Sequence, residues 1–86
     1  MKKNKKSKLL IGVTMGDPCG IGPEIILKAL KSPAIRRIAR YVIIGNKGVF
    51  DRTARTLNIP VEYSTISHIS DIDGLKTSIF LLPTGE

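Results

Sequence analysis

The segment LLIGVTMGDPCGIGPEIILKAL, residues 9–30, has the clearest local pattern in this 86-residue chain. It opens with a nearly continuous apolar run at 9–14, which predicts a strand buried on both faces, as in parallel sheets covered by helices. Glycines and prolines crowd the stretch that follows. Pro23-Glu24 is then typical of a helix start, because proline costs nothing there and the acid suits the helix dipole. We therefore predict a strand, a turn, and a helix from Pro23 to about Leu30.

The rest of the chain continues to alternate between helix and strand patterns. The predicted elements are a short helix at 34–39, a strand at 40–44, a helix at 47–57, a strand at 61–63, a polar loop at 67–73 and a strand at 78–82 that Pro83 ends. This alternation predicts a three-layer α/β fold with a mainly parallel sheet. Because no helix follows the last predicted strand, we expect one sheet edge, and one face, to stay open.

The charge is unevenly distributed. The formal net charge is +7, but five lysines lie within residues 1–8, and residues 9–86 carry only nine bases against seven acids. The terminal segment has no arginine and no interleaved aromatic residue, so we interpret it as a solvated, disordered tail and expect neither nucleic acid nor a membrane as partner. The predicted organisation is a basic tail at 1–8 and one incomplete amino-terminal α/β segment at 9–86.

The composition favours folded, intracellular material. The chain is 42% hydrophobic with a mean hydropathy of +0.07. Its apolar runs fall far short of the roughly 20 residues that span a bilayer, and no small-residue cleavage site follows the first of them. Cys19 is the single cysteine, so no internal disulfide can form and a reducing compartment is expected. We therefore expect a cytoplasmic protein.

The loop between the first predicted strand and helix is the candidate site. In open α/β sheets, ligands bind at the carboxyl ends of strands, where this loop begins. It is no Walker A loop, because no Gly-Lys-Ser/Thr follows the glycines, and residues 20–25 lack the third glycine of the dinucleotide fingerprint. Glu24 would also compete with a phosphate for the N–H groups of the first helical turn.

Each candidate residue has a structural alternative. Asp17 can cap its own turn or contact a cofactor or substrate. Gly20 and Gly22 can permit tight strand-to-helix packing or the close approach of a dinucleotide. Cys19 has no neighbouring base and is not expected to be a nucleophile, and His68 is the only histidine, too few for a metal site. We assign no catalytic residue and no metal ligand.

The string TMGDPCGIGPEI, residues 14–25, closely resembles the amino-terminal signature of the 4-hydroxythreonine-4-phosphate dehydrogenases of pyridoxal phosphate biosynthesis, which usually have alanine where Cys19 stands. Three further features resemble the continuation of that family: Val42-Ile43-Ile44-Gly45, the helix that carries Phe50 and Arg52, and Asn58-Ile59-Pro60. The resemblance covers roughly residues 9–83.

The resemblance implies an oxidoreductase with an isocitrate/isopropylmalate dehydrogenase-like fold. It implies a homodimer that uses NAD and a divalent metal to oxidise and decarboxylate 4-phosphooxy-threonine or a related phosphorylated hydroxy acid. In that family the metal-binding histidines and most cofactor contacts lie beyond the matched segment. The 86-residue chain alone is therefore expected to be inactive and to bind neither NAD nor metal well. Asp17, Gly20 and Gly22 are its candidate cofactor-binding residues.

Three other interpretations stay open. Isocitrate and isopropylmalate dehydrogenases share a Gly-Asp followed by Gly-Ile-Gly-Pro-Glu, although the extra Pro18-Cys19 here favours the first family. A stand-alone, non-catalytic α/β interaction protein would use the open sheet edge and the basic tail. A truncated product would have no function.

Overall fold

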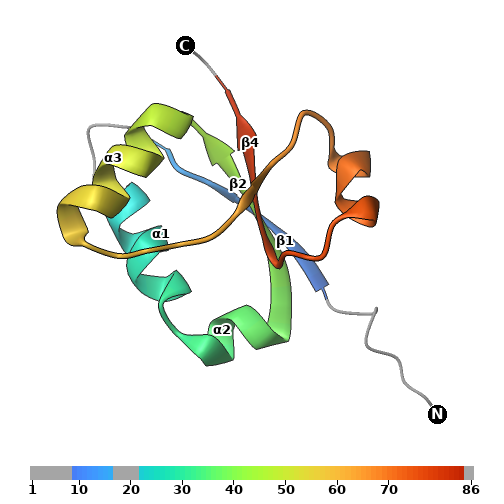
Figure 1. Ribbon diagram of the computed structural model, residues 1–86, viewed down its shortest axis with the longest axis horizontal. Helices are drawn as coiled ribbons and strands as arrows, with labels where there is room; N and C mark the ends of the chain where they lie inside the picture. The colour runs from blue at the N-terminus through green and yellow to red at the C-terminus, as the bar shows by residue number, and fades with distance from the viewer. Residues whose placement is uncertain (1–8, 17–21, 85–86) are drawn as a thin grey trace.

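The computed structural model describes residues 9–16 and 22–84. Their elements are β1 (Leu9–Thr14), α1 (Gly22–Leu30), α2 (Pro33–Ile38), β2 (Ala39–Gly45), α3 (Lys47–Leu57), β3 (Ser64–Thr65), the 3-10 helix η2 (Ile69–Gly74) and β4 (Ile79–Pro83). All strand pairs are parallel, in the order β1-β2-β4-β3. Figure 1 shows α1, α2 and α3 on one face of the sheet and η2 on the other. The predicted parallel α/β fold is confirmed, and η2 supplies a thin third layer.

The sheet order differs from the order of the strands along the chain. The connections through α1–α2 and α3 lie on the same face, and the connection through η2 then returns β4 to a place between β2 and β3. The last predicted strand is therefore an interior strand of the sheet. Ile79, Phe80 and Leu81 are all nearly fully buried, and an interior position is the one that buries both faces of such a strand.

β1 is the edge strand instead, and the prediction that both of its faces are buried is wrong. The exposed fractions of Leu9, Leu10 and Ile11 are 68%, 41% and 38%. Within the described residues β1 has a neighbouring strand, β2, on one side only. An apolar run indicates a strand but says nothing about what covers it, and this is why the sequence pattern misled.

The sheet separates two apolar cores. The helix-side core contains Met15, Leu27, Leu30, Ala39, Tyr41, Ile43, Phe50, Ile59, Ile79 and Leu81. The far-side core contains Val42, Ile66, Ile72 and Phe80. Alternate residues of β2 and β4 enter opposite cores because successive side chains of a strand point to opposite faces. No helix among the described residues is long and apolar enough to cross a membrane.

Helix boundaries follow from local capping. The Ser32 hydroxyl accepts a hydrogen bond from the Ile35 N–H at 3.3 Å and starts α2, and the Asn46 side-chain oxygen accepts from the Val49 N–H at 2.9 Å and starts α3. α3 ends where Asn58 adopts a left-handed conformation with φ of 58°. Both cap types satisfy backbone groups that a helix end leaves unpaired, so the predicted bounds of these helices are close to the observed ones.

Two predictions between α3 and β4 are wrong. Residues 61–63 form no strand, and pairing with β4 is confined to Ser64 and Thr65. The predicted polar loop contains η2, whose start is fixed because the Asp71 carboxylate accepts hydrogen bonds from the N–H groups of Ser67 and His68. The buried Ile72 then anchors η2 on the far-side core.

Candidate ligand-binding crevice

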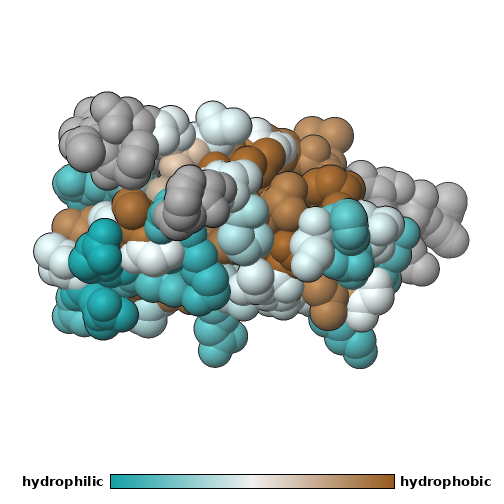
Figure 2. All heavy atoms as spheres, turned by 90° about the horizontal axis from the view of Figure 1, so that it is seen from above, coloured by the Kyte–Doolittle hydropathy of each residue, from teal (hydrophilic) through white to brown (hydrophobic). Residues whose placement is uncertain are grey.

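The carboxyl ends of β1, β2 and β4 meet at one edge of the sheet. The Met15 N–H donates to the Ile44 carbonyl at 3.0 Å, and the Thr84 N–H donates to the Gly45 carbonyl at 2.9 Å. Gly22 lies against the Met15 carbonyl at the same edge. We call the set of residues gathered here the candidate crevice: Met15, Gly16, Gly22, Gly45, Asn46 and Thr84. Figure 2 views the molecule from this end and shows apolar surface in its middle and toward the right, with hydrophilic surface mainly at the lower left. The location is the one where open parallel sheets bind ligands.

Two glycines of the candidate crevice are required by packing against Met15. A Cβ atom added to Gly22 would clash with the Met15 carbonyl oxygen, and one added to Gly45 would lie 2.5 Å from the Met15 sulfur. Met15 itself is only 3% exposed, so its side chain has little room to move. The structure thus supports the packing interpretation of Gly22: it lets the amino end of α1 approach the end of β1.

Gly16 has a different role. Its φ is +71°, in the left-handed region that residues with a Cβ rarely adopt, and among the described residues, its chain neighbours aside, no atom lies within 4 Å of the position where its Cβ would stand. Conformation rather than crowding therefore favours glycine here. Immediately after β1, the described residues leave free space beside the Gly16 backbone, as a close backbone approach to a ligand requires.

The structure places only part of the predicted site. Gly22 lies in the candidate crevice at the first residue of α1. Asp17, Gly20 and Cys19 lie outside the described residues, as does the Lys-rich segment 1–8. Glu24 accepts a hydrogen bond from Lys28 at 2.9 Å in an exposed pair one turn along α1. Glu24 thus has a structural role in the first turn of its helix.

Sequence reasoning missed the contribution of Gly45 and Asn46 to the crevice. The available signal was their position directly after an apolar strand, which was interpreted only as a turn. The Asn46 side chain also caps α3, so one residue ends β2 and starts the next helix. The described part of the crevice offers backbone groups and the Thr84 hydroxyl, while the Asn46 side-chain oxygen already caps α3. These groups can bind and orient a ligand.

The described residues contain no set of side chains suited to hold a metal ion. Among residues 9–16 and 22–84, no group of three or more His, Cys, Asp and Glu side chains is arranged to hold an ion. His68 is exposed at the start of η2, as expected for a loop residue. The described residues therefore do not fit the divalent metal that the family resemblance implies, and we route no chemical step through it.

A charged cluster lies outside the crevice, between α3 and the segment before β3. The Asp51 carboxylate accepts hydrogen bonds from the Tyr63 hydroxyl and from Lys47 Nζ, the latter at 2.7 Å. The Tyr63 ring packs edge-on against buried Phe50, with centroids 5.5 Å apart. This cluster fastens residues 61–63 to α3, which explains why they do not extend the strand.

The cluster is a clamp rather than a catalytic site. Burial raises the pKa of Asp51, but the hydrogen bonds from Lys47 and Tyr63 outweigh it and leave that pKa below its usual value. The hydrogen bond to Asp51 raises the pKa of Lys47. Burial and the same carboxylate raise the pKa of Tyr63, so its phenol stays protonated and cannot act as a base near neutral pH.

A hollow lies at the opposite edge of the sheet. It has a volume of about 470 Å³ and is lined by Arg36, Pro60, Glu62, Thr77, Ser78 and Ile79. These residues lie around the amino end of β4, whereas parallel sheets bind ligands at the carboxyl ends of strands. The candidate crevice at 15–16, 22, 45–46 and 84 is therefore the better site.

The fold and the crevice define a parallel α/β segment with a glycine-rich strand-to-helix loop. No protein-family model matches the chain. A 4-hydroxythreonine-4-phosphate dehydrogenase from Trichlorobacter lovleyi is 40% identical over 72 residues, which are 84% of this chain and 21% of that protein. A protein from Oceanobacillus iheyensis, provisionally named a D-threonate 4-phosphate dehydrogenase, is 39% identical over 56 residues, 65% of this chain and 17% of its own.

A solved structure has the same fold. The crystal structure of a 4-hydroxythreonine-4-phosphate dehydrogenase from Burkholderia phymatum matches 93% of this chain and 24% of its own, with a TM-score of 0.78 and 22% sequence identity. The sequence relatives are named dehydrogenases, so the family that the chain resembles is one of oxidoreductases. The sequence and structure matches together support this chain as a segment of the 4-hydroxythreonine-4-phosphate dehydrogenase family, and it spans about a fifth of the length of the relatives it matches. The resemblance noted in residues 14–25 is confirmed.

Proposed function

We propose that this chain is a segment of an NAD-dependent dehydrogenase that oxidises and decarboxylates 4-phosphooxy-threonine or a related phosphorylated hydroxy acid, in pyridoxal phosphate biosynthesis. The observation that carries the proposal is the loop at 14–25, which matches the family signature and leaves β1 at the ligand-binding edge of the sheet. The names of both sequence relatives support the substrate class, since each describes a dehydrogenase of a 4-phosphorylated compound.

The proposed whole protein is a cytoplasmic homodimer that uses NAD and a divalent metal. The near-balanced charge of residues 9–86 supports a small-molecule substrate over nucleic acid or a membrane surface as partner. Bound NAD would supply the hydride acceptor. The role of this segment is to bind the cofactor. The ends of β1 and β2 offer a surface against which it can lie, and the described residues leave space for it beside the Gly16 backbone.

Asp17, Gly20 and Gly22 remain the proposed cofactor-binding residues, but they are not equally suited to a test of cofactor binding. Packing against the Met15 carbonyl already accounts for glycine at position 22. A substitution there would disturb the fold as well as any ligand contact. Asp17 is therefore the better residue for testing cofactor binding.

A segment exchange tests the proposal directly. Residues 9–83 would replace the matching segment of the Trichlorobacter lovleyi relative, and NAD reduction would be followed with 4-phosphooxy-threonine and with D-threonate 4-phosphate. We expect the chimera to reduce NAD with at least one of the two. Asp17→Ala in the chimera should raise the KM for NAD, whereas Arg37→Ala, on exposed α2, should leave it unchanged. A folded chimera inactive on both substrates, beside an active parent, would refute the proposal.

The isolated chain provides a second test. Because the described residues hold no metal donor set, we expect no turnover and no rise in Tm when NAD and Mg²⁺ are added to the 86-residue chain. Saturable stabilisation by NAD would show that this segment binds the cofactor by itself and would overturn the expectation that the segment is insufficient.

A further inference from the structure

Met15 joins two connections that meet at the candidate crevice. Its N–H donates to the Ile44 carbonyl at 3.0 Å, so the end of β1 is fixed to β2. Its side chain lies against Gly45, since a Cβ atom added there would stand 2.5 Å from the Met15 sulfur and 2.9 Å from the Met15 Cβ. Its carbonyl oxygen fills the place that a side chain at Gly22 would need, where α1 begins. One residue thus holds the β1–α1 and β2–α3 connections together.

These contacts of Met15 are internal to the segment. Met15 is 3% exposed and belongs to the helix-side core, and chain that packs nearby can only bury it further. A Cβ atom at position 45 would point toward the Met15 side chain, and so into this core rather than outward. The Met15 side chain therefore has almost no surface left for a ligand. It can act on a ligand only through the backbone that packs against it.

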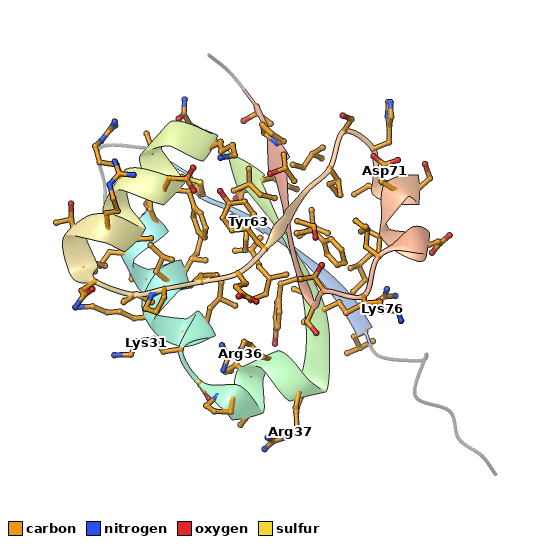
Figure 3. All side chains as sticks on the ribbon, in the orientation of Figure 1. Lys31, Arg36, Arg37, Tyr63, Asp71 and Lys76 are labelled. Carbon is orange, nitrogen blue, oxygen red and sulfur yellow. The ribbon has the colours of Figure 1, made fainter. Side chains whose placement is uncertain are left out.

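Ligand binding in the candidate crevice depends on where its backbone lies. None of the six residues of the candidate crevice carries a charge. Lys47, the next residue after them along α3, is paired with Asp51. Figure 3 shows Lys31, Arg36 and Arg37 at the end of the molecule where β2 starts, opposite the carboxyl ends of the strands. Backbone N–H and C=O groups bind a ligand only over a narrow range of distance and angle, so a small shift of the backbone weakens binding.

We propose that Met15 is a positioning residue for cofactor binding: its side chain sets the backbone of the candidate crevice through Gly45, without touching the cofactor. An unbranched methionine side chain suits this role, because it fills the irregular space that the missing side chain of Gly45 leaves. The inference rests on the proposed function, since it takes NAD as the ligand of the candidate crevice. It adds that the affinity for NAD depends on a contact inside the helix-side core.

The chimera that carries residues 9–83 tests the proposal, with the Kd for NAD measured by isothermal titration calorimetry and the Tm by circular dichroism. Met15→Ala removes the sulfur and Cγ beside Gly45 and should raise the Kd for NAD by at least about fivefold. Met15→Leu restores the volume and should return the Kd to within about twofold of the unmodified chimera. Ile79→Ala is the matched control: Ile79 is also 3% exposed in the helix-side core, but it lies at the start of β4. It should lower the Tm and leave the Kd for NAD unchanged.

Gly45→Ala disturbs the same contact from the other side and keeps the proposal testable if Met15→Ala does not fold. Its methyl group would displace the Met15 side chain, so the Kd for NAD should rise here too. An unchanged Kd in folded Met15→Ala or Gly45→Ala, an equal rise in Ile79→Ala, or a Met15→Leu variant as weak as Met15→Ala would each overturn the proposal. An unmodified chimera that binds no NAD would overturn the proposed function together with this inference, so the two failures are distinguishable.

Discussion

Met15 is the residue against which separate parts of the chain converge. Its carbonyl faces Gly22, its side chain faces Gly45, and its N–H bonds to Ile44. The glycines at positions 16 and 22 are required for different reasons. At position 22 a Cβ atom would clash with the Met15 carbonyl oxygen, and at position 16 the backbone has a positive φ that favours glycine. A motif that resembles a ligand loop thus contains residues whose identity the fold alone requires.

Gly22→Ala should destabilise the chain. The added methyl group would collide with the backbone oxygen of Met15, which cannot rotate away as a side chain can. Crowding of this kind costs about 1–3 kcal/mol of unfolding free energy, measurable by urea denaturation. Gly12→Ala is the control: its nearest neighbour would be the Ile44 side chain at 3.9 Å, so its stability should be unchanged or higher. Equal losses in the two variants would contradict the steric explanation.

Tyr63→Phe should lower stability in a pH-dependent way. Asp51 has a lowered pKa in the folded chain, so its contribution is present above the ordinary value of 3.8 and is lost as pH falls through the folded pKa. Removing the Tyr63 hydroxyl moves that folded pKa back up. We expect a loss of about 1 kcal/mol at pH 7 that shrinks toward pH 2, measured as unfolding free energy against pH.

Tyr41→Phe is the matched control for this effect. The Tyr41 hydroxyl donates to the uncharged Ile35 carbonyl at 2.7 Å. Its removal should cost a similar amount of free energy at pH 7 and at pH 2. If the two variants lose the same stability at every pH, the hydrogen bond from Tyr63 to Asp51 is not what lowers the pKa of that carboxyl.

At the scale of elements, local signals fixed the helices well and the strands less well. α2 and α3 begin at Ser32-Pro33 and at Asn46, and α3 ends at Asn58, all through contacts within a few residues. Strand residues depend on partners that are distant in the sequence. Residues 61–63 show the difference, because Tyr63 contacts Asp51 and Phe50 on α3 and the pairing with β4 starts only at Ser64.

Asn58→Ala should destabilise α3. Asn58 holds a left-handed conformation while its N–H caps the carbonyls of Ala54 and Arg55, and a Cβ-bearing residue without a polar side chain pays roughly 1–2 kcal/mol there. Asn58→Gly should be neutral or slightly stabilising, since glycine adopts this conformation freely. Thermal unfolding followed by circular dichroism distinguishes them, and a variant pair with identical Tm would show that the cap carries no conformational cost.

At the scale of the whole molecule, two cores share one sheet. β2 and β4 send alternate side chains into the helix-side core and the far-side core. Neither core can lose its strands without the other, so the described part of the chain should unfold as one unit. In this small a protein, with a stability of roughly 0.05–0.15 kcal/mol per residue, a single core substitution has a large effect.

Phe80→Ala tests this coupling. Phe80 is fully buried in the far-side core, and its truncation should cost about 3–5 kcal/mol. Both tyrosines, Tyr41 and Tyr63, lie on the helix side, and the chain has no tryptophan. Tyrosine fluorescence therefore reports the opposite core, and its urea midpoint should fall together with the circular dichroism signal. If the urea midpoint of tyrosine fluorescence stays at its wild-type value in Phe80→Ala, the two cores unfold separately.

The sequence by itself determined the elements and the family. Apolar periodicity, proline at helix starts and capping residues act over a few residues, so β1, α1, α2, β2, α3 and β4 could be located from them. The string at 14–25 indicated the dehydrogenase family for the same reason, since it is contiguous. Of the candidate site residues, Gly22 lies at the crevice, whereas the contacts of Asp17 and Gly20 stay predictions.

Only the tertiary structure decided the order of the strands, the exposure of β1, and the use of Gly45 and Asn46 in the crevice. It also showed that the Met15 carbonyl leaves no room for a Cβ atom at position 22 and that the Tyr63 hydroxyl donates a hydrogen bond to Asp51. Each of these depends on residues that the local pattern does not connect. Burial and strand neighbours are properties of the packed chain, because an apolar run fixes what a strand prefers to contact but not which segment arrives to cover it.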